Sequence, residues 1–79
     1  MHGTTLSFAY RTSTVARLVE RSVRPEVGEI EGDRTSATVS REGDTVTVEI
    51  EAADLVALRA GLNTWLSLVS VAERVGGVD

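Results

Sequence analysis

The chain has 79 residues, enough for one domain, and 42% of them are hydrophobic, a balance typical of a soluble globular protein rather than a disordered or membrane-spanning one. It has eight arginines against twelve carboxylates, no lysine and no cysteine, for a net charge of −4. The lack of cysteine excludes disulfides and thiolate metal sites, and the acidity argues against strong unaided binding to nucleic acid.

The first two predicted elements are a strand and a helix. Residues 4–10 alternate between apolar and small or polar side chains, with Leu6, Phe8 and Tyr10 on the inner side of a half-buried strand. A cap at Thr12 or Ser13 then begins a helix that ends near Arg24, because Pro25 disfavours helical geometry in the residue before it. We expect its inner side to contain Val15, Leu18, Val19, Ser22 and Val23, opposite Arg17, Glu20, Arg21 and Arg24.

A hairpin is predicted next. The acidic, glycine-containing segment 26–33 has no clear period and indicates a loop. Residues 34–41 and 45–51 alternate again, and Glu42-Gly43-Asp44 predicts a tight turn between them. The outer sheet face is expected to be solvated; its residues are Thr5, Ser7, Ala9, Ser36, Thr38, Ser40, Thr45, Thr47, Glu49 and Glu51. No sheet edge has lysine or proline to deter pairing, which leaves edge-to-edge dimerisation open.

The last helix begins at a cap on Asp54 and runs to about Val75. At 100° per residue, one stripe is expected to lie on the sheet: Leu55, Leu58, Leu62, Trp65, Leu66, Val69 and Ala72. A second apolar band contains Ala57, Ala60, Gly61, Thr64, Leu68, Val71 and Val75, beside a polar wedge with Arg59 and Asn63.

This second band predicts a docking surface for a partner protein, because a domain with two helices covers only one flank of the last one. The alternative is that the first helix covers the band. Gly61 favours close approach of another backbone, since a mid-helix glycine costs about 1 kcal/mol relative to alanine.

The order β-α-β-β-α predicts one α+β domain over residues 1–79, with a three-stranded antiparallel sheet and two helices on one face. No catalytic constellation, metal-ligand cluster or phosphate-binding loop stands out. His2, the only histidine, is expected to be a frayed terminal residue, and the acidic segment 26–33 a solvated loop. We therefore expect a protein without enzymatic activity, cofactor, metal or small-molecule substrate of its own.

The C-terminal stretch DLVALRAGLNTWLSLVSVAERV, with Leu58-Arg59-Ala60 and Asn63-Thr64, resembles the Pcc family of small KEOPS subunits. The preceding TVTVEIEAAD and the first helix running into ERSVRPE add to the likeness, which covers nearly the whole chain. The resemblance implies a β-α-β-β-α domain and a non-catalytic scaffold. It also implies a homodimer that docks its helices on the catalytic KEOPS subunit, which transfers a threonylcarbamoyl group to adenosine 37 of tRNA.

By position, the resemblance assigns Leu58, Ala60, Gly61, Thr64, Leu68 and Val71 to the docking helix or its neighbourhood. It leaves Arg59 and Asn63 with either a structural role or a tRNA contact, and direct tRNA contacts otherwise fall to arginines such as Arg11, Arg17, Arg21 and Arg24. A small kinase-ATPase subunit would be an indirect partner.

Source and location follow from composition. The missing lysine favours a halophilic archaeon, although a GC-rich genome would also replace lysine by arginine. The N-terminus lacks the basic and apolar blocks of a secretory signal, so we expect a cytoplasmic protein away from membranes. Two other functions fit a domain of this size: a dimeric small-molecule-binding regulator, with residues 25–33 as a pocket wall, and a small RNA-binding domain.

Overall fold

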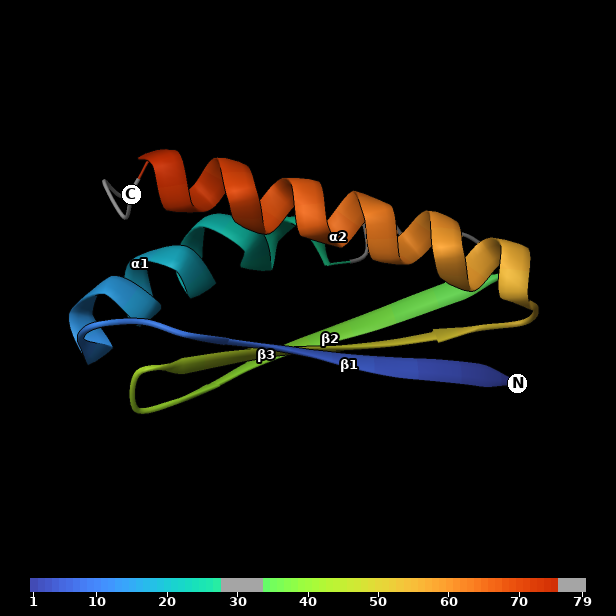
Figure 1. Ribbon diagram of the computed structural model, residues 1–79, viewed down its shortest axis with the longest axis horizontal. Coiled ribbons are helices and arrows are strands. Elements are labelled where there is room, and N and C mark those ends of the chain that lie inside the picture. Colours follow the sequence, from blue (N-terminus) through green and yellow to red (C-terminus); the bar gives the residue numbers. More distant parts are fainter. Residues whose placement is uncertain (28–33, 76–79) are drawn as a thin grey trace.

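The computed structural model describes residues 1–27 and 34–75, which form two layers (Figure 1). A three-stranded antiparallel sheet of order β1-β3-β2 is one layer, and two helices on the same sheet face are the other. The elements in chain order are β1 (His2–Ala9), α1 (Ser13–Val23), the 3-10 turn η1 (Arg24–Glu26), β2 (Thr35–Glu42), β3 (Thr45–Ala52) and α2 (Leu55–Val75). The predicted order and fold class are confirmed.

Local side-chain chemistry defines the ends of these elements. The Thr12 hydroxyl accepts the Val15 N–H at 3.1 Å, and the Asp54 carboxylate accepts the Ala57 N–H at 2.8 Å, so both predicted helix caps are confirmed. The hairpin turn places Gly43 at φ 62°, a left-handed conformation that glycine adopts without steric cost.

The N-terminal strand differs from its prediction. It begins two residues earlier, and His2 pairs with Ala52 of β3, so the expectation of a frayed terminal histidine is wrong. Residues 28–33 of the predicted acidic loop and the terminal Gly76-Gly77 lie outside the described residues.

The core lies between the layers. Its buried side chains are Ala16, Val19, Val23, Ala37, Val39, Val46, Val48, Ile50, Ala52, Trp65, Val69 and Ala72. The outward-facing residues of the sheet are exposed or partly exposed, as predicted. The helices therefore provide all the cover for this sheet within the described residues, and one sheet face stays in water.

Helix α1 faces the sheet differently from its predicted orientation. Ala16 is fully buried, whereas Leu18 is 45% exposed, so the predicted inward position of Leu18 is wrong. The small Ala16 side chain lets the helix lie close to the sheet, and Glu20 reaches an arginine of β2. The hydrophobic pattern assigned Glu20 to the solvent side of α1. In the structure this side faces β2, where Glu20 pairs with Arg41.

Helix α2 is also rotated. Leu55 is 62% exposed and Leu66 is 41% exposed, so their predicted place on the sheet is wrong. The residues of the expected stripe that are buried or half-buried are Leu58, Leu62, Trp65, Val69 and Ala72. The buried stripe has therefore shifted toward the second apolar band, and the leucines at the opposite margin have moved out to solvent.

Gly61 faces the sheet of this chain. A Cβ placed on Gly61 would lie 3.4 Å from Cγ2 of Ile50 and 3.9 Å from Cγ2 of Thr35, which is ordinary van der Waals contact. Further along the helix, Leu68 packs against the core. This side of α2 is thus packed inside the chain.

Much of the apolar surface of α2 stays uncovered. By length and composition, α2 is the one helix in the described part of the chain that could cross a membrane, and 17% of its apolar 18-residue window is buried. It lies along the sheet as in Figure 1, and Arg59 and Asn63 interrupt its exposed surface. Uncovered apolar surfaces of this kind typically mark contact sites for another protein or a membrane.

Candidate protein-docking surfaces

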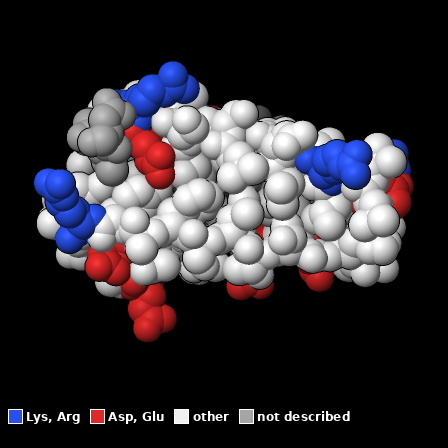
Figure 2. Space-filling view, viewed as in Figure 1, with Lys and Arg blue, Asp and Glu red and all other residues white. Residues whose placement is uncertain are grey.

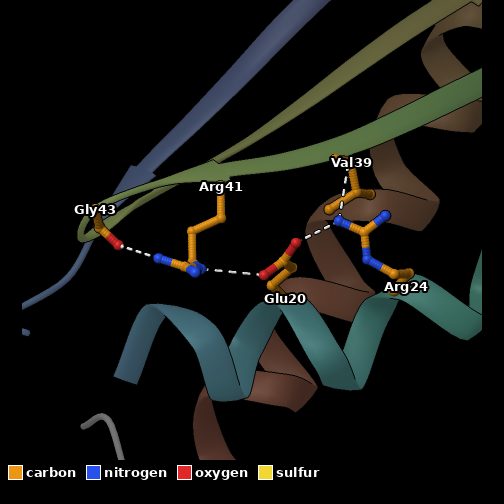
Figure 3. A network of polar contacts seen from close by, with 5 residues as sticks. All are labelled: Glu20, Arg24, Val39, Arg41 and Gly43. Carbon is orange, nitrogen blue, oxygen red and sulfur yellow. Dashed lines mark hydrogen bonds and ion pairs between the residues drawn. The ribbon is translucent and has the colours of Figure 1, made fainter. Parts of the chain in front are cut away.

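The free edge of β2 is shielded by a network of polar contacts from α1 (Figure 3). Glu20 forms an ion pair with Arg24 and accepts from Nε of Arg41 at 3.1 Å. Arg24 also donates to the carbonyl of Val39 at 3.2 Å, and Arg41 donates to the carbonyl of Gly43 at 2.9 Å. A second strand could pair at the Val39 carbonyl only after displacing the Arg24 guanidinium.

Replacing Glu20 with glutamine is expected to lower the free energy of unfolding by about 1–2 kcal/mol at neutral pH, because two arginines share its carboxylate. These hydrogen bonds, the one from Arg24 first, hold the pKa of Glu20 below its usual value of 4.5. A carboxyl with a lower pKa in the folded state stabilises the fold above its unfolded pKa, and this contribution is lost as the pH falls through its folded pKa.

Urea denaturation at a series of pH values would test this origin. The difference between the parent chain and the variant should shrink as the pH falls below about 4.5. Glu42→Gln is the matched control, because Glu42 is exposed and forms no ion pair with a described residue. A difference that stayed constant into the acid range would contradict the assignment.

The free edge of β1 is open by comparison. All eight residues of β1 pair with β3 on one side. On the other side, no hydrogen bond from residues 1–27 or 34–75 reaches the backbone of the strand. Leu6 and Phe8 on its inner face are only partly buried, although both pack against the core. This strand therefore offers unpaired backbone groups beside partly exposed apolar side chains.

The side of α2 above this edge is apolar as well. Leu55, Leu58, Leu62 and Arg59 line a hollow of about 270 Å³ together with Thr4 of β1. Exposed Leu66 continues the same side of the helix. The surface made by the free edge of β1 and these α2 residues is called the β1–α2 flank below. Figure 2 shows a broad area without charged side chains between charged groups toward the two ends of the molecule.

Glu73 lies where α2 passes the end of β1. Its Oε2 accepts the Tyr10 hydroxyl at 2.7 Å, an interaction between residues 63 positions apart. Burial, strengthened by this hydrogen bond and the carboxylate's charge, raises the pKa of Tyr10 well above its usual range. Tyr10 therefore stays protonated, and its hydroxyl holds the Glu73 carboxylate in a fixed position.

The opposite side of α2 forms a second surface with α1. A groove of about 310 Å³ runs between the two helices, lined by Ser22, Val23, Glu26, Leu68, Val71, Ala72 and Val75. Val71 is 50% exposed and Val75 is 79% exposed. This surface is called the α1–α2 groove below. Its walls are apolar apart from Ser22 and Glu26, which suits an amphipathic helix.

The structure gathers only part of the predicted docking band. Leu68, Val71 and Val75 meet in the α1–α2 groove. Ala57, Ala60, Gly61 and Thr64 lie nearer the start of α2, where Gly61 faces the sheet and the Thr64 hydroxyl donates to the Ala60 carbonyl at 2.9 Å. The sequence analysis placed Leu55 and Leu66 on the sheet and so did not identify them as surface residues; in the structure both are exposed at the margin of that stripe.

The polar residues predicted as structural or tRNA contacts lie on the surface. Arg59 and Asn63 are exposed on α2, and Arg17 and Arg21 are exposed on α1. None of these arginines forms an ion pair with another residue that the structure describes. They are therefore available to external groups.

A third hollow, of about 310 Å³, lies on the sheet face away from the helices, over Gly3, Ser36, Thr38, Glu49 and Glu51 among others. Within the described residues there is no group of three or more histidine, cysteine, aspartate or glutamate side chains that could hold a metal ion.

Comparison with known proteins identifies the family. The family profile described as "Transcription factor Pcc1" matches residues 3–76. Eleven chains of solved structures match as well; one, from "Crystal structure of binary complex Gon7-Pcc1", has a TM-score of 0.85 and 17% identity over 98% of this chain and 94% of that chain. No curated protein matches. The resemblance seen in the sequence is confirmed, and the chain belongs to the Pcc1 family of KEOPS accessory subunits.

Proposed function

We propose that this chain is a non-catalytic scaffold of KEOPS that pairs with a second copy and docks the catalytic subunit, thereby supporting threonylcarbamoyl transfer to adenosine 37 of tRNA. The main supporting observation is that α2 presents two separate apolar surfaces, the β1–α2 flank and the α1–α2 groove. The proposed scaffold needs two such surfaces, because the second copy and the catalytic subunit must be bound at the same time.

The α1–α2 groove is the proposed site for the catalytic subunit. Val71 and Val75 present aliphatic side chains next to Leu68, and burying them would favour association by about 25 cal/mol for each Å² of apolar area. A helix from the partner would lie between α1 and α2, with its apolar side toward Val71. The kinase-ATPase subunit would then be an indirect partner, reached through the catalytic one.

The β1–α2 flank is the proposed site for a second copy of this chain. Its strand edge can extend the sheet across a two-fold axis, and the exposed leucines beside it can be buried in the same contact. The β2 edge is unsuited to this because Arg24 already occupies the Val39 carbonyl. The similar solved structure is a complex of Pcc1 with Gon7; for this chain we propose a homodimer.

Contact with tRNA would be secondary. Arg17 and Arg21 on α1, and Arg59 and Asn63 on α2, are exposed and could reach phosphate or base groups inside the full complex. The net charge of −4 opposes strong binding by the chain alone. We place the complex in the cytoplasm, where tRNA is modified.

Replacing Val71 with glutamate is expected to reduce co-elution with the catalytic subunit at least about ten-fold, because it places a charge inside the apolar groove. Val71 is a better probe than Leu68, which packs against the core and would disturb folding. Size-exclusion chromatography of the mixed, purified subunits gives the measurement.

Val56→Glu is the matched control, since Val56 is 76% exposed on the same helix and lines neither surface. It should co-elute like the parent chain, and both variants should keep the parent's circular dichroism and oligomeric state. Undiminished co-elution of Val71→Glu would overturn the proposed docking site.

A further inference from the structure

One helical stripe of α2 runs along the β1–α2 flank with an opposite charge at each end. Leu55, Arg59, Leu62, Leu66 and Glu73 follow one another at intervals of four, three, four and seven residues. Intervals of three and four place side chains on one side of an α-helix, as in helices that pack side by side. The stripe therefore has a leucine-rich middle with a cation toward its start and a carboxylate toward its end.

The charges are symmetric in position and opposite in sign. Arg59 and Glu73 lie seven residues to either side of Leu66, or about 10 Å along the helix in each direction. A two-fold axis through Leu66 would therefore bring Arg59 of one copy beside Glu73 of the other, and form this contact twice. A parallel pairing would instead set arginine against arginine and glutamate against glutamate.

The middle of this stripe lies beside the middle of β1. Gly61 lies against Ile50, which pairs with Thr4, and Glu73 is bonded to Tyr10. Twelve helical residues at about 1.5 Å therefore run beside six strand residues at about 3.3 Å, in the same direction and over nearly the same length. By this count Leu66 lies beside the region of Leu6 and Ser7, near the middle of β1. Figure 1 shows α2 and β1 running in the same direction.

The axis that pairs the stripes would accordingly also pair the two β1 edges as antiparallel strands. Both copies would keep their helices on the same face of a continuous six-stranded sheet. A two-fold axis through Leu66 would thus pass near the middle of β1, where antiparallel pairing can use most of the strand.

Both charged groups are prepared for this contact. Arg59 is exposed and has no ion pair among the described residues. Glu73 is half-buried, and its Oε2 accepts from Tyr10, whereas no hydrogen bond or ion pair from residues 1–27 or 34–75 reaches its Oε1. Because the Tyr10 hydroxyl already holds the Glu73 carboxylate, Glu73 loses little further side-chain entropy when it binds an incoming guanidinium.

We propose that a reciprocal Arg59–Glu73 pair, formed twice across a two-fold axis through Leu66, sets the register and specificity of self-association through the β1–α2 flank. This inference rests on the proposed homodimer and adds the residues that select the second copy. The leucines supply the buried area, and the charge pairs reject parallel or shifted arrangements, which would place like charges together.

A charge swap tests the inference. Arg59→Glu and Glu73→Arg should each raise the dimer dissociation constant about ten-fold or more at low salt, because each puts two like-charged pairs in contact. The double variant should return to within a few-fold of the parent chain. Sedimentation equilibrium across salt concentrations gives the constants, and circular dichroism confirms that each variant is folded.

Two features of the series separate an ion pair from a structural effect. Arg59→Glu leaves the Tyr10–Glu73 hydrogen bond untouched, and the double variant lacks that bond, so recovery in the double variant cannot come from Tyr10. Arg74→Glu is the control, since Arg74 is exposed on the same helix but lies about 100° from Glu73 around its axis. It should leave the dissociation constant unchanged.

The outcomes distinguish this inference from the proposed homodimer. Weakened single variants with a recovered double variant would support the pair. A dimeric parent whose single variants bind as tightly as it does, or whose double variant fails to recover, would overturn the pair and leave the homodimer standing. A parent chain that is monomeric at all concentrations would overturn both.

Discussion

Replacing Trp65 with alanine is expected to lower the free energy of unfolding by several kcal/mol. Trp65 is 2% exposed and is the largest side chain buried in the core. Loss of a buried tryptophan costs about 3–5 kcal/mol through lost burial and the cavity that remains. A domain of 79 residues has a total stability of roughly 4–12 kcal/mol, so this one change removes much of it.

Far-UV circular dichroism with urea denaturation would measure the loss. Trp65→Phe should cost less, because it keeps an aromatic ring in the same space, and Val56→Ala should cost almost nothing because Val56 is exposed. All chains must be compared at one concentration, since dimerisation adds to apparent stability. A Trp65→Ala chain as stable as the Val56→Ala chain would mean that α2 does not depend on Trp65 for its packing.

The order of the elements was predictable because each has a local signal. Alternation in the strands, the caps at Thr12 and Asp54, and glycine in the hairpin turn depend only on neighbours in sequence. The same residues show these features in the structure. Family membership was predictable for a similar reason, since the order and spacing of residues along the last helix are properties of the sequence itself.

The orientation of the helices was less predictable, because it depends on residues distant in sequence. Hydrophobic periodicity assigned Leu66 to the sheet, but in the structure α2 turns Gly61 toward Ile50 and leaves Leu66 41% exposed. Similarly, the pattern of α1 could not show that Glu20 meets Arg41, 21 residues away. Such contacts between residues far apart in the sequence determine which part of the second apolar band of α2 is exposed.

The choice between the two sheet edges also required coordinates. In the sequence both edges lack lysine and proline, so both were open to pairing. In the structure Arg24 occupies the Val39 carbonyl of β2, whereas β1 lies beside the exposed leucines of α2. The missing lysine suggested a halophilic source. This stays a prediction, because neither the fold nor the comparisons test the source of the chain.

Replacing Leu66 with glutamate is expected to raise the dimer dissociation constant about 100-fold or more, the largest effect on assembly that we predict for one side chain. The proposed two-fold axis passes through Leu66, so the change buries two carboxylates next to each other with no cation between them. Like charges in contact cost several kcal/mol at an interface, and each 1.4 kcal/mol corresponds to a factor of ten. Sedimentation equilibrium gives the constant.

The separated monomer should stay folded, because Leu66 is already 41% exposed within one chain. It should also still bind the catalytic subunit, since the α1–α2 groove lies on the other side of α2. Leu55→Glu is the graded control: Leu55 lies at the end of the same stripe, 62% exposed, where water can reach the new charge, so its effect should be smaller. A Leu66→Glu chain that stays dimeric at low concentration would move the self-association surface away from the β1–α2 flank.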